Sequence, residues 1–223
     1  MQQIVIRTDI IQGGDQWHAA RLGKITGSGF AKLVGTAAAK EKYIYDKASE
    51  IVTGSRCDGD EYTNIHMQRG HEYESLARVK YILGTLNDVQ EVGIVEYDNY
   101  TACSPDGLVG DDGIIEIKVL DSNNHFKQIL EISSKGIQAI PKDHLLQMQF
   151  NMFVCNRQWC DYVLYNQKHE VNNGDLFVYR VEKDIKTQLE IKAAIEEAKE
   201  RIISCVNKYY LLVTKTKANG LIN

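Results

Sequence analysis

The chain of 223 residues is long enough for one large domain or two small ones. Its 43% hydrophobic and 25% charged residues are typical of a globular chain, and no apolar run approaches the ~20 residues of a membrane span. The formal net charge of −4 argues against nucleic-acid binding by bulk positive charge, although basic side chains along one groove would suffice.

The sequence shows no division into domains. Only two prolines occur, Pro105 and Pro141, and no linker rich in Pro, Gly or Ser interrupts the chain, so we expect a single domain over residues 1–223. The five cysteines are odd in number and lack a Cys-x-x-Cys pair, which argues against a disulfide framework and a structural zinc site. Residues 1–11 lack a signal-peptide pattern, so we expect reduced thiols and a cytoplasmic protein.

The first third of the chain is predicted to be helical, because its apolar residues recur at steps of three and four. Four helices are expected: a short one capped by Asp15 and stopped by Gly23, a second capped by Thr26 or Ser28, a third over 40–52 ended by Gly54, and a fourth over 62–83 ended by Gly84.

The middle of the chain changes to the alternating period of strands. We expect strands over 89–97, over 101–108 with a Ser-Pro-Asp-Gly turn inside it, over 113–119, over 159–165 and over 176–181. Helices are expected over 125–132, from Pro141 to Val154, and from about Ile185 onward. Helices on both sides of a mixed sheet predict an α/β layer fold.

The most informative segment combines a turn aspartate with an apolar strand that carries an acid and a lysine. Glu116 and Lys118 are two residues apart in a strand, so both point to one face while the isoleucines between and before them point into the core. A hairpin can fold Asp106 back beside Glu116. Magnesium prefers hard oxygen ligands, which two carboxylates and a backbone carbonyl, here that of Ile117, would supply.

Such a metal lowers the pKa of water to make a nucleophile, and Lys118 can hold that water and stabilise charge on the attacked phosphate. The same residues also allow an ordinary structural interpretation. Ser-Pro-Asp-Gly is a common turn, and an acid–x–lysine strand is often a solvent-facing ion pair.

Pro105–Asp106 followed by Glu116–Lys118 resembles the PD-(D/E)-x-K nuclease signature. Four more segments, in the right order along the chain, resemble the phage lambda exonuclease and YqaJ-type viral recombinase family. These segments are Gly13–Ser28 (Trp, then Arg-x-Gly, then Ile-Thr-x-Ser), Arg69–Arg78 (Gly-x-x-x-Glu), Thr101–Leu108 and His144–Phe150 (Gln-x-Gln). Together these segments span roughly Gly13 to Tyr165, most of the chain.

The resemblance implies a restriction-endonuclease-like core, a mixed central β-sheet flanked by helices, with two Mg²⁺ ions for which Mn²⁺ can substitute. It implies a 5′-to-3′ exonuclease of phage-type homologous recombination that hydrolyses one strand of duplex DNA and leaves a 3′ single-stranded overhang. It also implies a homotrimer that acts on DNA ends beside a single-strand annealing protein, encoded by a phage or prophage in a bacterial host.

The resemblance also implies roles for individual residues. Asp106 and Glu116, with the carbonyl of Ile117, would bind the metals, Lys118 would activate the water and Glu74 would hold water at the metal. The 5′-phosphate would be gripped by Arg21, Ser28, Ser104 and Gln147.

Four assignments stay open at this point. Glu91 matches a further family acid with a different spacing to Asp106, and Glu74 could instead be a helical ion-pair partner of Arg78. Met67 could wedge against a terminal base pair or pack in the core. His144 stands where the family often has an aromatic residue, and its role is undecided.

Two other functions are compatible with the sequence. A structure- or site-specific endonuclease could use the same core, and a catalytically inactive DNA-binding module could retain it. The intact Asp106, Glu116 and Lys118 argue against an inactive module, while Arg21 and Gln147 favour an exonuclease, because an endonuclease needs no pocket for a terminal phosphate.

Overall fold

The computed structural model describes residues 4–57 and 65–218, without the side chains of 65–72 and 216–218. Its strands are β1 (Val5–Arg7), β2 (Val89–Gln90), β3 (Ile94–Asp98), β4 (Thr101–Cys103), β5 (Gly107–Val109), β6 (Gly113–Val119), β7 (Trp159–Tyr165) and β8 (Leu176–Glu182). Its helices are α1 (Asp15–Ala20), α2 (Gly27–Leu33), α3 (Ala37–Thr53), α4 (Ile65–Thr85), α5 (Ser122–Lys135), α6 (Lys142–Cys155) and α7 (Ile185–Ala218), with 3-10 turns η1 (Gly136–Ala139) and η2 (Gln167–Asn172).

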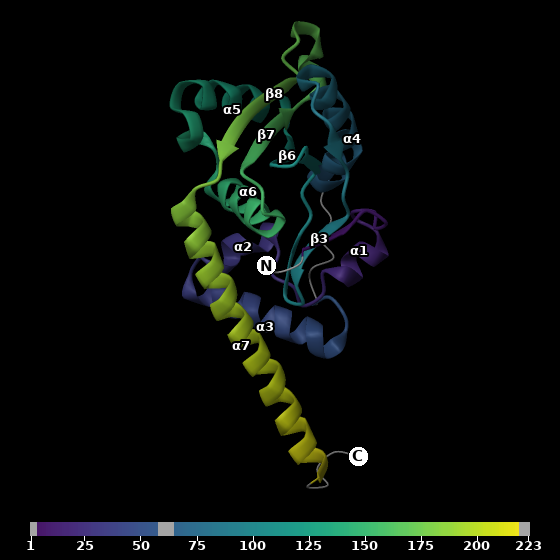
Figure 1. Ribbon diagram of the computed structural model, residues 1–223, viewed down its shortest axis with the longest axis vertical. Coiled ribbons are helices and arrows are strands. Elements are labelled where there is room, and N and C mark those ends of the chain that lie inside the picture. Colours follow the sequence, from purple (N-terminus) through teal and green to yellow (C-terminus); the bar gives the residue numbers. More distant parts are fainter. Residues whose placement is uncertain (1–3, 58–64, 219–223) are drawn as a thin grey trace.

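The predicted α/β class with a mixed sheet is confirmed (Figure 1). The larger sheet has the strand order β2-β5-β6-β7-β8, in which only β6 and β7 run parallel. A smaller antiparallel sheet has the order β1-β3-β4. Parallel neighbours need a crossover, and here α5 and α6 make it between β6 and β7.

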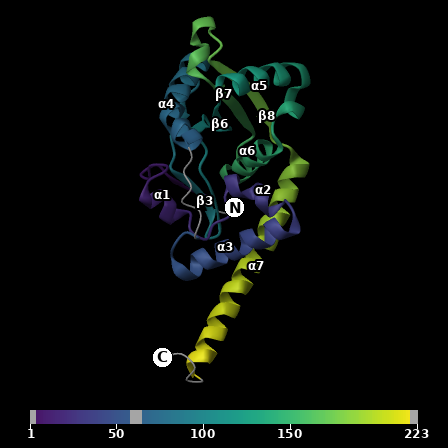
Figure 2. The ribbon, with the colours of Figure 1, turned by 180° about the vertical axis from the view of Figure 1, so that it is seen from behind.

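Strand β6 separates two apolar layers, as its alternating sequence predicts. Ile115 and Ile117 pack with Tyr81 of α4 on one face of the sheet. Ile114 packs on the other face, in the core that α2, α3, α6 and α7 share. Glu116 and Lys118 therefore lie on the α6 side of the sheet. The prediction that they face away from Ile115 and Ile117 is confirmed (Figure 2 shows α4 and α6 from behind).

The predicted strand over 89–97 is wrong as a single element. It forms β2 and β3, which belong to different sheets, because the chain passes tightly against a neighbouring segment at Gly93. A Cβ on Gly93 would come within 2.0 Å of the carbonyl oxygen of Ile10, so only glycine allows this close approach.

Several helix ends also differ from the predictions. Gly14, not Asp15, is the N-cap of α1, and Asp15 lies in the first turn, where a carboxylate is favourable. Helix α4 continues through Gly84 to Thr85, and the chain turns at Leu86, whose φ is 59°. The predicted stop of α3 at Gly54 is confirmed, since Gly54 adopts the left-handed conformation at φ 66°.

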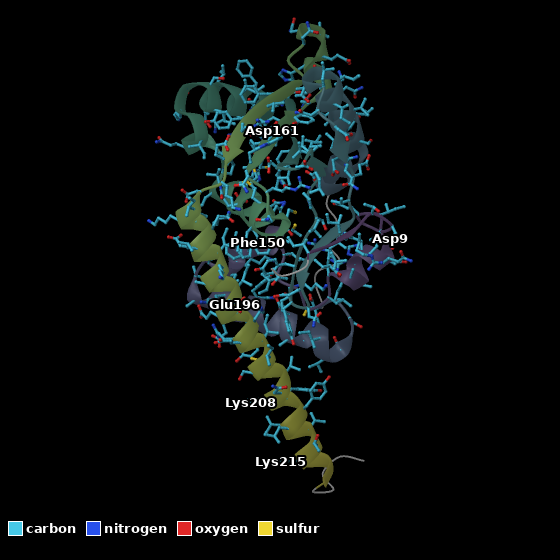
Figure 3. The ribbon with its side chains drawn as sticks, viewed as in Figure 1. Asp9, Phe150, Asp161, Glu196, Lys208 and Lys215 are labelled. Carbon is cyan, nitrogen blue, oxygen red and sulfur yellow. The ribbon has the colours of Figure 1, made fainter. Side chains whose placement is uncertain are left out.

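Helix α7 packs on the body through its first half only. Ile191, Ile195, Ala198 and Ile202 are buried in the core, whereas the later turns extend away from the other elements (Figure 3, where Lys208 and Lys215 mark them). Among the described residues, no helix combines the length and the hydrophobicity needed to cross a lipid bilayer.

A buried carboxylate joins β7, β8 and α4. Asp161, labelled in Figure 3, accepts hydrogen bonds from the Tyr81 hydroxyl at 2.7 Å and from the Arg180 guanidinium at 2.8 and 2.9 Å. The guanidinium lies over the Trp159 ring, 3.6 Å from its centroid. Because Asp161 is fully paired, its burial is tolerated.

We therefore expect Asp161→Ala to lower the free energy of unfolding by about 3 kcal/mol, because it leaves the Tyr81 hydroxyl and the Arg180 guanidinium without their acceptor. Urea denaturation monitored by circular dichroism measures the change. The control is Asp9→Ala, which removes a carboxylate from the exposed Arg7–Asp9 pair and should leave the unfolding free energy nearly unchanged. Equal effects of the two substitutions would contradict this role of Asp161.

Candidate active site

The Ser-Pro-Asp-Gly turn places Asp106 against β6, as predicted. The Asp106 amide donates to the Ile115 carbonyl at 3.2 Å, and the Asp106 carboxylate accepts the Ile117 amide at 2.5 Å. Sequence positions ten residues apart thus meet because β5 and β6 pair, with Gly107 opposite Ile115.

Glu116 and Lys118 form an ion pair on the same face of β6. The Lys118 ammonium donates to Glu116 Oε1 at 2.7 Å, and the Glu116 side chain is only 2% exposed. Burial alone would lower the pKa of Lys118, but the charges of Glu116 and Asp106 outweigh it and raise the pKa. Lys118 is therefore an ammonium group at neutral pH.

The carboxylates of this centre repel one another. Burial raises the pKa of Asp106 well above its usual range, and the charges of Glu116 and Glu74 raise it further, against the opposing effects of Lys118 and the Ile117 amide. A divalent cation would relieve this repulsion, so the donor set fits an oxygen-liganded metal.

Arg78 organises the second half of the centre. Its guanidinium donates to the Asp106 carbonyl at 2.9 Å and pairs with Glu74 at 2.8 Å and with Glu91 at 2.8 Å. The helical Glu74–Arg78 pair thus exists, and it lies beside Asp106. Glu91 was expected within the strand over 89–97, but it lies in the link between β2 and β3, and its side chain is 72% exposed.

Helix α6 lines the centre from the other side. Gln147 Oε1 accepts from Lys118 at 3.3 Å, and the Asn151 amide donates to Glu116 Oε2 at 3.2 Å. His144 Nδ1 lies 2.7 Å from the hydroxyl of Tyr162, which is paired with Glu116 in the β6–β7 register. Burial, together with the charge of Lys118, lowers the pKa of His144 to about 4, so His144 is neutral at pH 7.

Three of the four residues expected to hold a terminal phosphate, Arg21, Ser28 and Ser104, come together next to this centre. Arg21 donates to the Ser104 hydroxyl at 3.2 Å and to the Ser28 hydroxyl at 3.4 Å. Its guanidinium lies over the Trp17 ring, 4.2 Å from the centroid, and the Trp17 indole also donates to Ser104, at 2.8 Å. Trp17, which also packs against the small cluster of Ile10, Ile94 and Ala102, thus supports Arg21.

The fourth expected residue, Gln147, lies beside the start of α2, the helix that carries Ser28. Its side chain is in contact distance of Gly27, where a Cβ would lie 3.4 Å from Gln147 Cγ and 2.3 Å from Asn151 Oδ1. Gln147 therefore lies between the Arg21 group and Lys118. Residue 27 must be small for α2 to approach α6 this closely.

Two contributors were not identified from the sequence. Asn151 lies one helical turn after Gln147, a spacing that places both on the same face of α6 and could have indicated it. Arg78 was noted only as an ion-pair partner of Glu74. The side chain of Met67 lies outside the described residues.

Among the described residues, no group of three or more His, Cys, Asp and Glu side chains is arranged to hold a metal ion. A metal here would rely on the carboxylates of Asp106 and Glu116 and on the main-chain carbonyl of Ile117. Such oxygen donors suit Mg²⁺, which keeps several water ligands of its own.

Comparisons with known proteins agree with this picture. Residues 16–158 match the model of the YqaJ-like viral recombinase domain. An alkaline exonuclease, LHK-Exo from Laribacter hongkongensis, is 33% identical with a TM-score of 0.78, over 94% of this chain and 100% of that chain. The structure of LHK-Exo in complex with dAMP matches at 34% identity and a TM-score of 0.77, over the same shares of the two chains.

A phage-related exonuclease from Haemophilus somnus 129PT has a TM-score of 0.61 at 17% identity, over 83% of this chain and 96% of that chain, which supports the fold alone. No match was found among curated proteins. The fold and the matches define this protein as a nuclease of the exonuclease class. The chain belongs to the YqaJ-like viral recombinase family.

Asn151→Ala should lower the kcat of cleavage by about ten- to a hundredfold, since a hydrogen bond to a charged group contributes about 1.5–3 kcal/mol. The KM for the nucleic acid should be unchanged, because Asn151 orients Glu116 and lies buried behind it. Asn207→Ala, the same change on an exposed turn of α7, serves as the control. A kcat of Asn151→Ala within twofold of the parent, in a protein with unchanged thermal unfolding, would show that Asn151 does not position Glu116.

Proposed function

We propose that this protein, as a single nuclease domain over residues 1–223, is a Mg²⁺-dependent 5′-to-3′ exonuclease that degrades one strand of duplex DNA in phage-type recombination. One observation carries the proposal. The Arg21 group and the carboxylate–lysine centre are joined by the Ser104-Pro105-Asp106 turn, in which Ser104 contacts Arg21 and Asp106 contacts β6. A terminal phosphate held by Arg21 would therefore lie close to the bond that is cut.

The arrangement has the parts that hydrolysis requires. Asp106, Glu116 and the Ile117 carbonyl would hold Mg²⁺, which supplies a water of lowered pKa and polarises the phosphate. Because its pKa is raised, Lys118 donates hydrogen bonds instead of accepting a proton, so its role is to orient the water and to stabilise charge on the phosphate. Glu74, held by Arg78 and close to Asp106, can accept hydrogen bonds from water at this centre.

The bond changes follow from the direction of attack. The oxygen of water bonds to the phosphorus, and the bond from phosphorus to the 3′ oxygen of the terminal nucleotide breaks. The terminal nucleotide leaves with a 3′ hydroxyl, and the next nucleotide keeps the phosphate on its 5′ oxygen. Each cut thus regenerates the 5′-phosphate that Arg21 is proposed to bind, and the complementary strand remains as a 3′ overhang.

The alternative is a structure- or site-specific endonuclease on the same core. That function needs no recognition of a terminal phosphate, so it leaves the convergence of Arg21, Ser28 and Ser104 without a purpose. A homotrimer and a single-strand annealing partner are also proposed, from the family resemblance alone. Light scattering at working concentration tests the trimer, and a monomeric mass would contradict it.

Asp106→Ala, Glu116→Ala and Lys118→Ala should each reduce the cleavage rate by at least about 10²–10³-fold, because each removes a group that acts on the reacting phosphate. Double variants should be little worse than single ones, since the three residues act as a unit. Digestion of linear duplex in Mg²⁺ measures the rates. Mn²⁺ should support cleavage, whereas Ca²⁺ or an excess of EDTA should abolish it.

The matched control is the exposed pair of α7, with Lys186→Ala and Glu190→Ala expected to cleave at the parent rate. Full activity in EDTA would contradict the metal mechanism. Near-parent activity of any one of the three central variants would mean that the centre is assigned wrongly.

Arg21→Ala should weaken binding to 5′-phosphorylated ends by about ten- to a hundredfold, because a guanidinium donates paired hydrogen bonds to a phosphate dianion. The parent should digest 5′-phosphorylated duplex faster than 5′-hydroxyl duplex, and Arg21→Ala should lose this preference while the metal centre is intact. The preference of Arg21→Lys for 5′-phosphorylated ends should lie between those of the parent and Arg21→Ala, since lysine keeps the charge but not the planar pair of donors.

Arg7→Ala is the control, because Arg7 is paired with the neighbouring Asp9 on the surface. If the parent and Arg21→Ala each digest 5′-phosphorylated and 5′-hydroxyl duplex at equal rates, the phosphate pocket is refuted and the endonuclease is favoured.

A further inference from the structure

Helix α6 turns a row of three polar side chains toward the candidate centre, at helical steps of three and four. Asn151 donates to Glu116 at 3.2 Å, and Gln147 accepts from Lys118 at 3.3 Å. The third member of the row is His144. Asn151 is buried, whereas Gln147 and His144 are only half-buried. The row therefore reaches the surface at His144, where a bound strand can touch it.

The hydroxyl of Tyr162 determines which nitrogen of His144 carries the proton. Nδ1 of His144 lies 2.7 Å from this hydroxyl, and Tyr162 is 1% exposed. A phenol keeps its proton at neutral pH, and among the described residues that proton has no acceptor other than Nδ1. Because a buried donor without an acceptor is costly, Tyr162 donates to Nδ1, and the proton of the neutral imidazole is on Nε2.

The Nε2–H group of His144 is a hydrogen-bond donor that nothing in the described part of the chain accepts from. The Lys118 ammonium is close enough for its charge to lower the pKa of His144. The carboxylate of Asp143 opposes this effect, but Asp143 is exposed and does not accept from the ring. A donor beside an ammonium group suits an anion, and in a nuclease the DNA backbone supplies phosphates.

The order of the strands indicates which phosphate reaches His144. In the larger sheet β5, β6 and β7 are neighbours, and Ser104 precedes β5, Lys118 lies on β6 and Tyr162 lies on β7. Under the proposed function, the 5′-phosphate lies with Arg21 and Ser104, and the phosphate that is cut lies at Lys118. His144 lies over β7, on the side of β6 away from β5. A strand that continues in this direction brings its next phosphate to His144.

We propose that His144 is a substrate-binding residue whose Nε2–H group donates to the third phosphate of the digested strand, counted from the 5′ end, while Tyr162 fixes the ring for this contact. The inference rests on the proposed function, in which the first phosphate is held by Arg21 and the second is cut. The third phosphate stays on the shortened strand and becomes the next one to be cut. His144 thus aligns the strand for the following step and favours a continuing backbone over a free dinucleotide.

The test measures binding to 5′-phosphorylated duplexes in Ca²⁺, in which cleavage is not expected. The third phosphate of the strand is either normal or an uncharged methylphosphonate. His144→Ala should raise the Kd for the normal duplex about tenfold, because a hydrogen bond to a charged phosphate is lost. The methylphosphonate should raise the Kd of the parent about tenfold more than that of His144→Ala, since both changes remove the same contact. In Mg²⁺, the kcat of the first cut should stay within about threefold of the parent, because His144 does not touch the phosphate that is cut.

Two variants separate this contact from packing and from ring orientation. His144→Phe keeps an aromatic ring against Tyr162 but has no donor, so it should bind like His144→Ala. Nitrogen-15 NMR of His144 should show the proton on Nε2 in the parent and a mixture of tautomers in Tyr162→Phe. His169→Ala, a histidine change on η2, is the matched control and should bind like the parent. A methylphosphonate far from the end should affect all variants equally.

The outcomes distinguish this inference from the proposed function. Equal effects of the methylphosphonate on the parent and on His144→Ala, with the preference for a 5′-phosphate intact, would show that His144 only packs against Tyr162. That result would overturn the inference and leave the proposed function standing, as would parent-like binding by His144→Phe. A methylphosphonate near the 3′ end that acts through His144, or a parent without preference for a 5′-phosphate, would instead overturn the proposed function.

Discussion

Repulsion between neighbouring carboxylates is the constraint around which this molecule is arranged. The strand pairing of β5 with β6 brings Asp106 beside Glu116, and α4 adds Glu74 to the same space. Uncompensated, such a group would resist folding, because buried carboxylates of like charge disfavour one another. Lys118 pairs with Glu116, and Arg78 pairs with Glu74 while it donates to the carbonyl of Asp106. These two cations allow the carboxylates to be held in place before any metal binds.

The turn that positions Asp106 also positions Ser104, so the proposed catalytic centre and the proposed pocket for a strand end share this segment. Ser104 contacts Arg21, whose position depends on Trp17 and on the start of α2. Gln147 lies between the two groups and contacts Lys118. An exonuclease that starts at a strand end needs the end and the bond that is cut to lie within one nucleotide of each other, and the short β4–β5 turn would meet this requirement under the proposed function.

The sequence predicts the parts of this arrangement that depend on local pattern. The alternation of β6 indicates which side chains face the core, and the spacing from Asp106 to Glu116 indicates a hairpin that brings them together; the structure confirms both. The resemblance predicts Arg21, Ser28, Ser104 and Gln147 as one group. The structure places Arg21 in contact with both serines and Gln147 in contact with Lys118, and the binding of phosphate stays a prediction.

The features that the sequence could not indicate depend on contacts between segments that are far apart in the chain. The break at Gly93 exists because Ile10 passes against it from a distant segment. Asn151 contacts Glu116 because α6 packs beside β6, and Gly27 lets α2 approach the same face of α6. Arg56 and Arg21 line one cavity because the end of α3 lies near α1. Such contacts between distant segments leave no local period in the sequence.

The most direct test of the account is digestion of end-labelled DNA in Mg²⁺, with a linear duplex phosphorylated at one 5′ end and a covalently closed circle of the same sequence. The account predicts release of mononucleotides from the phosphorylated 5′ end, with the complementary strand left as a 3′ overhang and the closed circle intact. Cleavage of the closed circle, or removal of nucleotides from the 3′ end first, would contradict it.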